Sequence, residues 1–126
     1  MNDRSATINL GGMEFELVLT TKATKEIAKR YGGLENLGDK LMKSENIEST
    51  LGEVTWLISL LANQSVLIHN LKHPNDKQTE VTEEMLDLLT SPADMALYKD
   101  AITEAMNRGM KRNVESEADP KNIKVE

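Results

Sequence analysis

Two histidines, His69 and His73, are the first residues to test for chemistry, because they lie four positions apart in the stretch HNLKH. On one unbroken helix this spacing places both imidazoles on the same face, where they could hold a metal ion. The stretch lacks the glutamate of an HExxH motif, and Pro74 follows directly, which predicts that His73 lies at a helix end. We interpret both histidines as polar helix-end residues and expect no metal site.

Paired carboxylates can carry out acid–base catalysis, and four carboxylates lie close together in the sequence: Glu83, Glu84, Asp87 and Asp94. The two glutamates fit better as negative charges at the positive start of a helix, and the two aspartates as capping or solvent-facing residues. The seven glycines form no phosphate-binding pattern, and no serine has the context of a catalytic nucleophile. We expect no catalytic residues, no cofactor and no enzymatic activity.

Lysines and methionines supply the candidates for partner binding. Three lysines recur at i, i+3 and i+7 and predict a basic stripe on one helix, the alternative being an ordinary solvated face. Three methionines on the last predicted helix are adaptable apolar side chains of the kind that holds varied partners, the alternative being core packing. The candidate partner-binding residues are Lys22, Lys25, Lys29, Met95, Met106 and Met110.

The element that must position these groups is the stretch at residues 54–71, which has no formal charge if its histidine is neutral. Its apolar residues cover more than half of a helical circumference, so the pattern predicts a long central helix at residues 51–72 with neighbours on several sides. Thr50 and Glu53 have the spacing of a capping box that would start it. The helix also carries a narrow polar strip, formed by Thr55, Ser59, Asn63 and Asn70.

Residues 6–19 alternate between apolar and polar on both sides of Gly11 and Gly12, which predicts a β-hairpin with a two-residue turn. We interpret the hairpin as a cover over the core, and the alternative is an edge that accepts a strand from a partner. Four more helices are predicted: from Thr20 or Thr21 to Tyr31, from Gly33 to Lys43, from Glu83 to Thr90, and from Ser91 to about Arg112.

The predicted fold class is therefore mainly α: an N-terminal β-hairpin followed by about five helices packed around the central one. We assign residues 1–113 to a single helical domain and residues 114–126 to a disordered polar tail. A wide apolar arc on so small a protein leaves self-association as a homo-oligomer open.

The composition of the chain bears on the compartment in which the protein acts and on the classes of partner that it could bind. The chain has 126 residues, a net charge of −6 and a pI of about 5.0, which argues against binding to nucleic acid through phosphates. The absence of cysteine and of a secretory signal pattern favours the cytoplasm. The uncharged stretch approaches the length of a membrane span, but its asparagines, glutamine and histidine are costly in lipid, so we expect no membrane insertion.

Three segments of the sequence follow one another in an order that resembles a known family. They are the hairpin TINLGGMEFELVLT, the following TKATKEIAKRYGGLENLGDKL and the long apolar helix. In these segments the chain resembles the tail assembly chaperones of long-tailed bacteriophages and related prophages of Gram-positive bacteria. The resemblance covers about residues 6–112 and rests on the order of elements and not on a catalytic motif.

The resemblance implies a non-enzymatic protein of the bacterial host cytoplasm that acts in virion morphogenesis and is absent from the mature virion. Its implied partners are the tape measure protein, which it would bind, and the tail tube protein, whose subunits it would recruit. In many members of this family a ribosomal frameshift appends a second domain, which here would attach after Asn113. The alternative function is a small acidic regulatory adaptor or inhibitor encoded by a phage or prophage.

Overall fold

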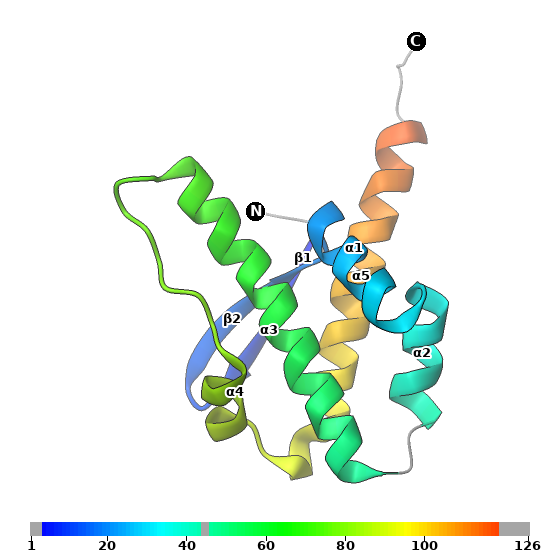
Figure 1. Ribbon diagram of the computed structural model, residues 1–126. Coiled ribbons are helices and arrows are strands. Elements are labelled where there is room, and N and C mark those ends of the chain that lie inside the picture. Colours follow the sequence, from blue (N-terminus) through cyan, green and yellow to red (C-terminus); the bar gives the residue numbers. More distant parts are fainter. Residues whose placement is uncertain (1–3, 44–45, 119–126) are drawn as a thin grey trace.

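The β-hairpin and the helices follow each other along the chain in the predicted order (Figure 1). The computed structural model describes residues 4–43 and 46–118, and within them it contains two strands and five α-helices. The elements are β1 (Ser5–Leu10), β2 (Met13–Val18), α1 (Thr21–Tyr31), α2 (Leu34–Lys43), α3 (Ile47–Lys72), α4 (Glu83–Leu89), the 3₁₀ turn η1 (Pro92–Asp94) and α5 (Met95–Ala118). The predicted fold class, mainly α with a hairpin and a long central helix, is confirmed.

The hairpin forms because two glycines accept the backbone angles of its turn. Gly11 has a φ of 58° and Gly12 a φ of 83°, so both lie in the left-handed region that a primed turn requires. The register pairs Leu10 with Met13 at the turn and Ser5 with Val18 at the open end. The buried apolar side chains of the two strands are Ala6, Ile8, Leu10, Phe15, Leu17 and Val18.

Helix α1 begins and ends at the residues that the sequence marks for these roles. The Thr20 hydroxyl accepts a hydrogen bond from the Ala23 amide at 3.0 Å, and Gly32 ends the helix with a φ of 85°. Helix α2 then buries Leu37 and Leu41. Both predicted short helices are therefore confirmed.

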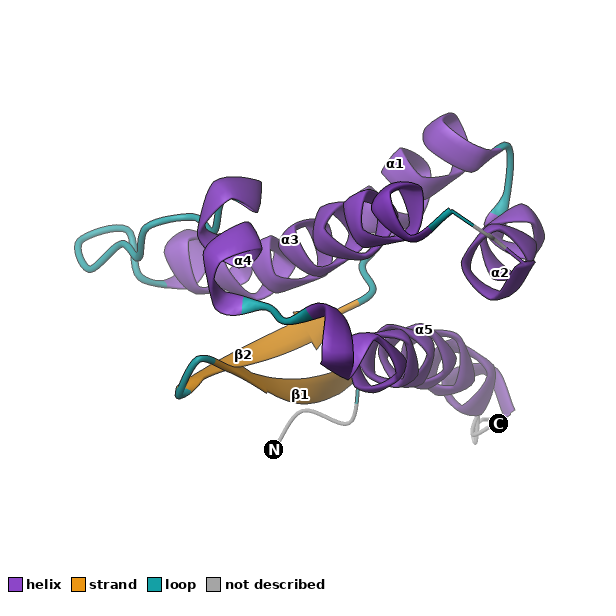
Figure 2. Cartoon of the chain, turned by 90° about the horizontal axis from the view of Figure 1, so that it is seen from below, coloured by secondary structure: helices purple, strands orange, loops and turns teal. Residues whose placement is uncertain are grey.

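Helix α3 is the centre of the core. Its residues Val54, Leu57, Ile58 and Leu61 have no exposed surface. Strand β2 packs against α3, and α5 packs against β1. Figure 2 shows α3 and α4 above the hairpin, with α5 beside β1.

The start of α3 differs from the sequence prediction. The helix begins at Ile47, and its N-cap is Asn46, whose side chain accepts a hydrogen bond from the Ser49 amide at 3.1 Å. The capping box predicted at Thr50 and Glu53 is therefore wrong. The Thr50 hydroxyl instead donates to the Asn46 carbonyl at 3.0 Å, because an earlier cap places it inside the first turn.

By length and composition alone, α3 is also apolar enough to cross a membrane. The most apolar 18-residue window of this helix has a mean hydropathy of 1.3, and 44% of that window is buried within the fold. The central helix of a folded core has the same properties. The absence of membrane insertion stays a prediction.

The polar strip of α3 holds the connection that follows the helix. The Asn63 amide group accepts from the Val81 amide at 2.6 Å and donates to the Val81 carbonyl at 2.8 Å. Further along α3, the Asn70 side chain accepts a hydrogen bond from the Gln78 amide at 2.8 Å and donates one to the Gln78 carbonyl at 3.1 Å. In Figure 1 this connection returns alongside α3 to reach α4. Each asparagine side chain therefore bonds to both the amide and the carbonyl of one backbone residue, as a residue of a neighbouring strand can do.

The last two predicted helices are present, and their bounds differ from the predicted ones. Thr82 caps α4, and the buried Val81 and Leu86 lie on either side of this cap at the spacing of a hydrophobic staple. Ser91 caps the η1 turn before α5. Helix α5 continues to Ala118, beyond the predicted end near Arg112, so residues 114–118 of the predicted tail are helical. Residues 119–126 lie outside the described residues.

We predict that Asn63→Ala lowers the free energy of unfolding by about 2 kcal/mol, because it leaves two polar backbone groups of the buried Val81 without a partner. Asn70→Ala is the matched control. It removes the same pair of hydrogen bonds from the exposed Gln78, where water replaces them, and should cost less than about 1 kcal/mol. Urea unfolding followed by circular dichroism measures both, and equal losses would contradict the assigned role of Asn63.

Candidate functional site

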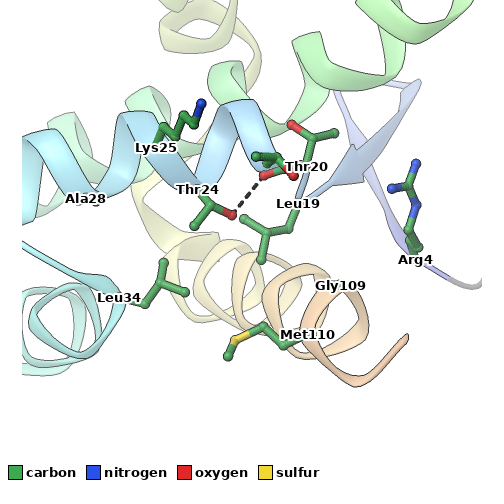
Figure 3. Close-up of a pocket in the computed structure, with 10 residues that line it drawn as sticks. Arg4, Leu19, Thr20, Thr24, Lys25, Ala28, Leu34, Gly109 and Met110 are labelled. Carbon is green, nitrogen blue, oxygen red and sulfur yellow. Dashed lines mark hydrogen bonds between the residues drawn. The ribbon is translucent and has the colours of Figure 1, made fainter. Parts of the chain in front are cut away.

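A groove of about 430 Å³ lies between α1 and the C-terminal half of α5 (Figure 3). This volume lies within the range of roughly 300–1,000 Å³ that ligand-binding clefts have. Leu34, the first residue of α2, closes one side of the groove, and Arg4, which precedes β1, lies at the other. The lining residues are Arg4, Leu19, Thr20, Thr21, Thr24, Lys25, Ala28, Leu34, Gly109 and Met110.

The floor of the groove depends on a close approach between Leu19 and α5. Leu19 follows β2 and is only 7% exposed. A Cβ atom placed on Gly109 would lie 2.8 Å from the Leu19 Cβ and 3.2 Å from the Leu19 carbonyl oxygen. Only glycine lets the helix come this near, so Gly109 sets the depth of the groove.

Two threonines of the α1 wall, Thr20 and Thr24, have hydroxyls that already take part in hydrogen bonds. Thr24 donates to the Thr20 carbonyl at 2.8 Å, and the Thr20 hydroxyl donates to the side-chain oxygen of Gln64, a buried residue of α3. The bond to Gln64 joins the start of α1 to α3, and the exposed Lys25 is the charged group of this wall. The groove therefore offers apolar contact with a cationic edge, which suits binding.

The three candidate lysines lie on the exposed side of α1, and one of them lines the edge of the groove. Lys25 lines it, while Lys22 and Lys29 continue the same stripe along the helix. The Lys29 ammonium lies 3.8 Å from the Glu26 carboxylate in a largely exposed pair, which contributes little to stability.

The three candidate methionines separate into two kinds. Met95 and Met106 are half-buried and pack against the core, so their placement matches the core alternative. Met110 is 49% exposed and lines the groove opposite α1. Sequence reasoning did not identify Leu19, Gly109 or the threonines of the groove, although a glycine inside a helix is a signal for close packing.

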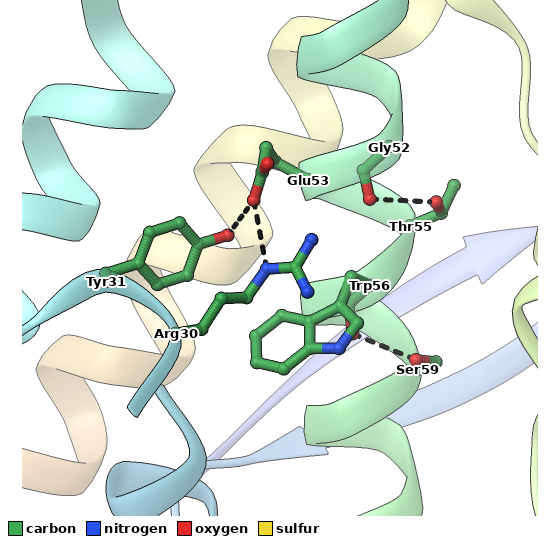
Figure 4. A network of polar contacts seen from close by, with 7 residues as sticks. All are labelled: Arg30, Tyr31, Gly52, Glu53, Thr55, Trp56 and Ser59. Atoms are coloured by element: carbon green, nitrogen blue, oxygen red, sulfur yellow. Dashed lines mark hydrogen bonds and ion pairs between the residues drawn. The ribbon is translucent and has the colours of Figure 1, made fainter. Parts of the chain in front are cut away.

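A second polar cluster joins α1 to α3 (Figure 4). The Glu53 carboxylate accepts hydrogen bonds from the Tyr31 hydroxyl and, at 3.3 Å, from Nε of Arg30. The Arg30 guanidinium lies 4.3 Å from the centroid of the Trp56 ring, and the Tyr31 and Trp56 rings meet edge to face at 6.1 Å. The cluster positions the α1 wall of the groove on the central helix.

The cluster keeps its groups in complementary ionisation states. Burial on its own would raise the pKa of Glu53, but hydrogen bonds from Tyr31 and Arg30 and the charge of Arg30 outweigh it, so this pKa is lowered. Burial, followed by the hydrogen bond to Glu53, raises the pKa of Tyr31. Tyr31 therefore donates as a neutral phenol, and Glu53 accepts as a carboxylate.

The two histidines take part in local contacts at the end of α3. Their rings lie 4.6 Å apart, and Nε2 of His69 is 2.8 Å from the Asp76 carbonyl oxygen. Among the side chains that the structure describes, those of residues 4–41 and 46–110, no group of three or more histidines and carboxylates is arranged to hold a metal ion.

The chain was compared with protein-family models, with curated proteins and with solved structures. None of these three comparisons found a match. The groove and the contacts around it are therefore the basis on which a function is proposed.

We predict that Glu53→Gln lowers the free energy of unfolding by about 1 kcal/mol at neutral pH, because the charge-assisted bonds from Arg30 and Tyr31 are weakened. A carboxyl with a lowered pKa stabilises the fold above its ordinary pKa and loses this contribution as the pH falls through the lowered value. The difference between wild type and variant should therefore shrink in acid. Denaturant titrations over a pH series test this.

The matched control for that experiment is Glu80→Gln, which changes an exposed glutamate in the connection before α4. Its effect should stay near zero at every pH. An unchanged gap between wild type and Glu53→Gln from neutral to strongly acidic pH would contradict the ion-pair role of Glu53.

We predict that Gly109→Ala destabilises the fold by about 1–3 kcal/mol, because the new methyl group meets the Leu19 Cβ and forces α5 outward. Gly52→Ala is the control: this glycine of α3 has no neighbouring atom near a new Cβ, so alanine should stabilise by about 0.5–1 kcal/mol through helix propensity. Thermal unfolding of both variants gives the two signs, and a neutral Gly109→Ala would disprove the close contact.

Proposed function

We propose that this protein is a tail assembly chaperone of a bacteriophage or prophage, which binds the tape measure protein and recruits tail tube subunits without catalysing a reaction. The resemblance of residues 6–112 to that family supports the proposal, and so does the agreement between the expected and observed order of elements. The protein would act in the cytoplasm of the bacterial host and leave the tail before the virion is complete.

The observation that carries the proposal is the meeting of two candidate surfaces in one groove. Lys25 of the basic stripe and Met110 of the methionine-bearing helix line the same groove from opposite walls. Lys25 contributes a positive charge to the groove, and Met110 contributes an adaptable apolar side chain. A surface that combines both properties is suited to hold a segment of another protein.

The physical task of such a chaperone fits the groove. A tape measure protein is long and helical, and its apolar faces must be shielded from one another before tube subunits cover them. A cleft between two helices can take up part of such a face.

Met110 is one of the large apolar residues that are exposed in the described part of the chain. The others lie outside the groove: Met13, Ile47, Leu71, Leu88 and Leu97.

We predict that co-expression with the tape measure and tail tube proteins encoded by the same genetic element captures both on the tagged chain. A pull-down at near-physiological salt followed by mass spectrometry measures this. The matched control is the tape measure protein of an unrelated phage, which should be captured weakly or not at all. Capture of neither cognate protein by a soluble, folded chain would contradict the proposed function and favour the alternative of an acidic adaptor or inhibitor.

A further inference from the structure

We propose that the groove between α1 and α5 binds one class of partner: an amphipathic helix with an acidic flank. This inference rests on the proposed function, because it names the part of a partner protein that the groove would take.

The shape fits the side of a helix. Helices α1 and α5 form two walls, and the buried Leu19 forms the floor between them. Helix-binding grooves take up apolar side chains that recur at i, i+3 or i+4 and i+7 on one face of the partner. The volume of about 430 Å³ has room for a few such side chains, and the fixed contact between Gly109 and Leu19 keeps the floor in place.

The charge of the groove is opposite to that of the whole protein. The chain has a net charge of −6, yet among the described residues that line the groove the charged ones are the cations Arg4 and Lys25, and none of them is a carboxylate. Lys22 and Lys29 extend this positive edge along α1, and Glu26, paired with Lys29, is the acid nearest to it in sequence. A helix with acidic residues along one flank is therefore attracted at this edge of a protein whose net charge is negative.

The positions of the lining residues also set the orientation of the partner. In Figure 3, Leu34 and Met110 lie on the side of the groove away from Lys25. The apolar face of a bound helix would contact Leu34, Met110 and the Leu19 floor, and its acidic flank would run along α1. The exposed Met110 can change rotamer to fit different apolar side chains, so the groove would accept related helices of varied sequence.

Two designed peptides of about 20 residues test the charge preference. Both carry leucine at i, i+3, i+4 and i+7, with glutamate at the flanking positions of one and lysine at those of the other. Fluorescence anisotropy with the full chain should give at least tenfold tighter binding of the glutamate peptide at low salt, and high salt should reduce this preference. Equal binding of the two peptides, or tighter binding of the lysine peptide, would overturn the proposal.

Charge-reversal and apolar-to-acid variants locate the site. Lys25→Glu and Met110→Glu should each weaken binding of the glutamate peptide at least tenfold. The matched controls are Lys77→Glu, in the exposed connection after α3, and Leu97→Glu, a 64% exposed residue of α5 about 20 Å from Met110 at roughly 1.5 Å per residue. Circular dichroism verifies that every variant is folded.

Full binding by the two folded groove variants would overturn the assignment of this groove, as would equal loss in the two control variants. Repeating the tape measure pull-down with the groove variants separates this inference from the proposed function. Cognate capture that persists in Lys25→Glu and Met110→Glu refutes the groove and leaves the chaperone function standing. No cognate capture by the wild type, together with groove-dependent binding of the glutamate peptide, refutes the chaperone function and supports the helix specificity of the groove.

Discussion

Helix α3 carries apolar side chains around more than half of its circumference, and no single neighbour can cover so wide an arc. Strand β2, helices α1 and α2, and helices α4 and α5 all contact it. Most of these elements are marginal alone, since a two-stranded hairpin and helices of seven to 11 residues have little stability in water. Burial against α3 supplies the stabilisation that they lack, which makes the described domain one cooperative unit.

The polar residues of α3 decide where the covering elements lie. Apolar packing tolerates sliding, whereas a hydrogen bond fixes one residue opposite another. Gln64 bonds to Thr20 at the start of α1, Asn63 to Val81 before α4, and Ser65 to Glu16 of β2 at 3.0 Å. These side chains point to different neighbours from adjacent positions on one helix. Asn63 and Asn70 of the narrow polar strip therefore help to fix the register of the covering elements, whereas Thr55 and Ser59 donate to carbonyls of α3 itself.

Local signals predicted most of the fold, because caps and turns depend on residues close in sequence. Gly11 and Gly12 form the predicted turn, α1 runs to Tyr31 as predicted after its cap at Thr20, and α4 begins at Glu83 as predicted. The start of α3 was missed because two sites competed: both Asn46 and Thr50 can cap a helix, and the cap at Asn46 adds one turn. The earlier cap also leaves Glu53 inside the helix, where it pairs with Arg30 and Tyr31, partners that no local pattern could name.

The groove could not be predicted from spacing, since Lys25 and Met110 come from opposite ends of the chain and meet only through the fold. Its parts differ in rigidity for a physical reason. The floor is fixed by the tight contact of Leu19 with Gly109, while the edges carry exposed, long and unbranched side chains. A rigid floor keeps the groove open without a partner, so binding costs little backbone ordering. Adaptable edges then let one groove accept helices that share a charge pattern but differ in sequence.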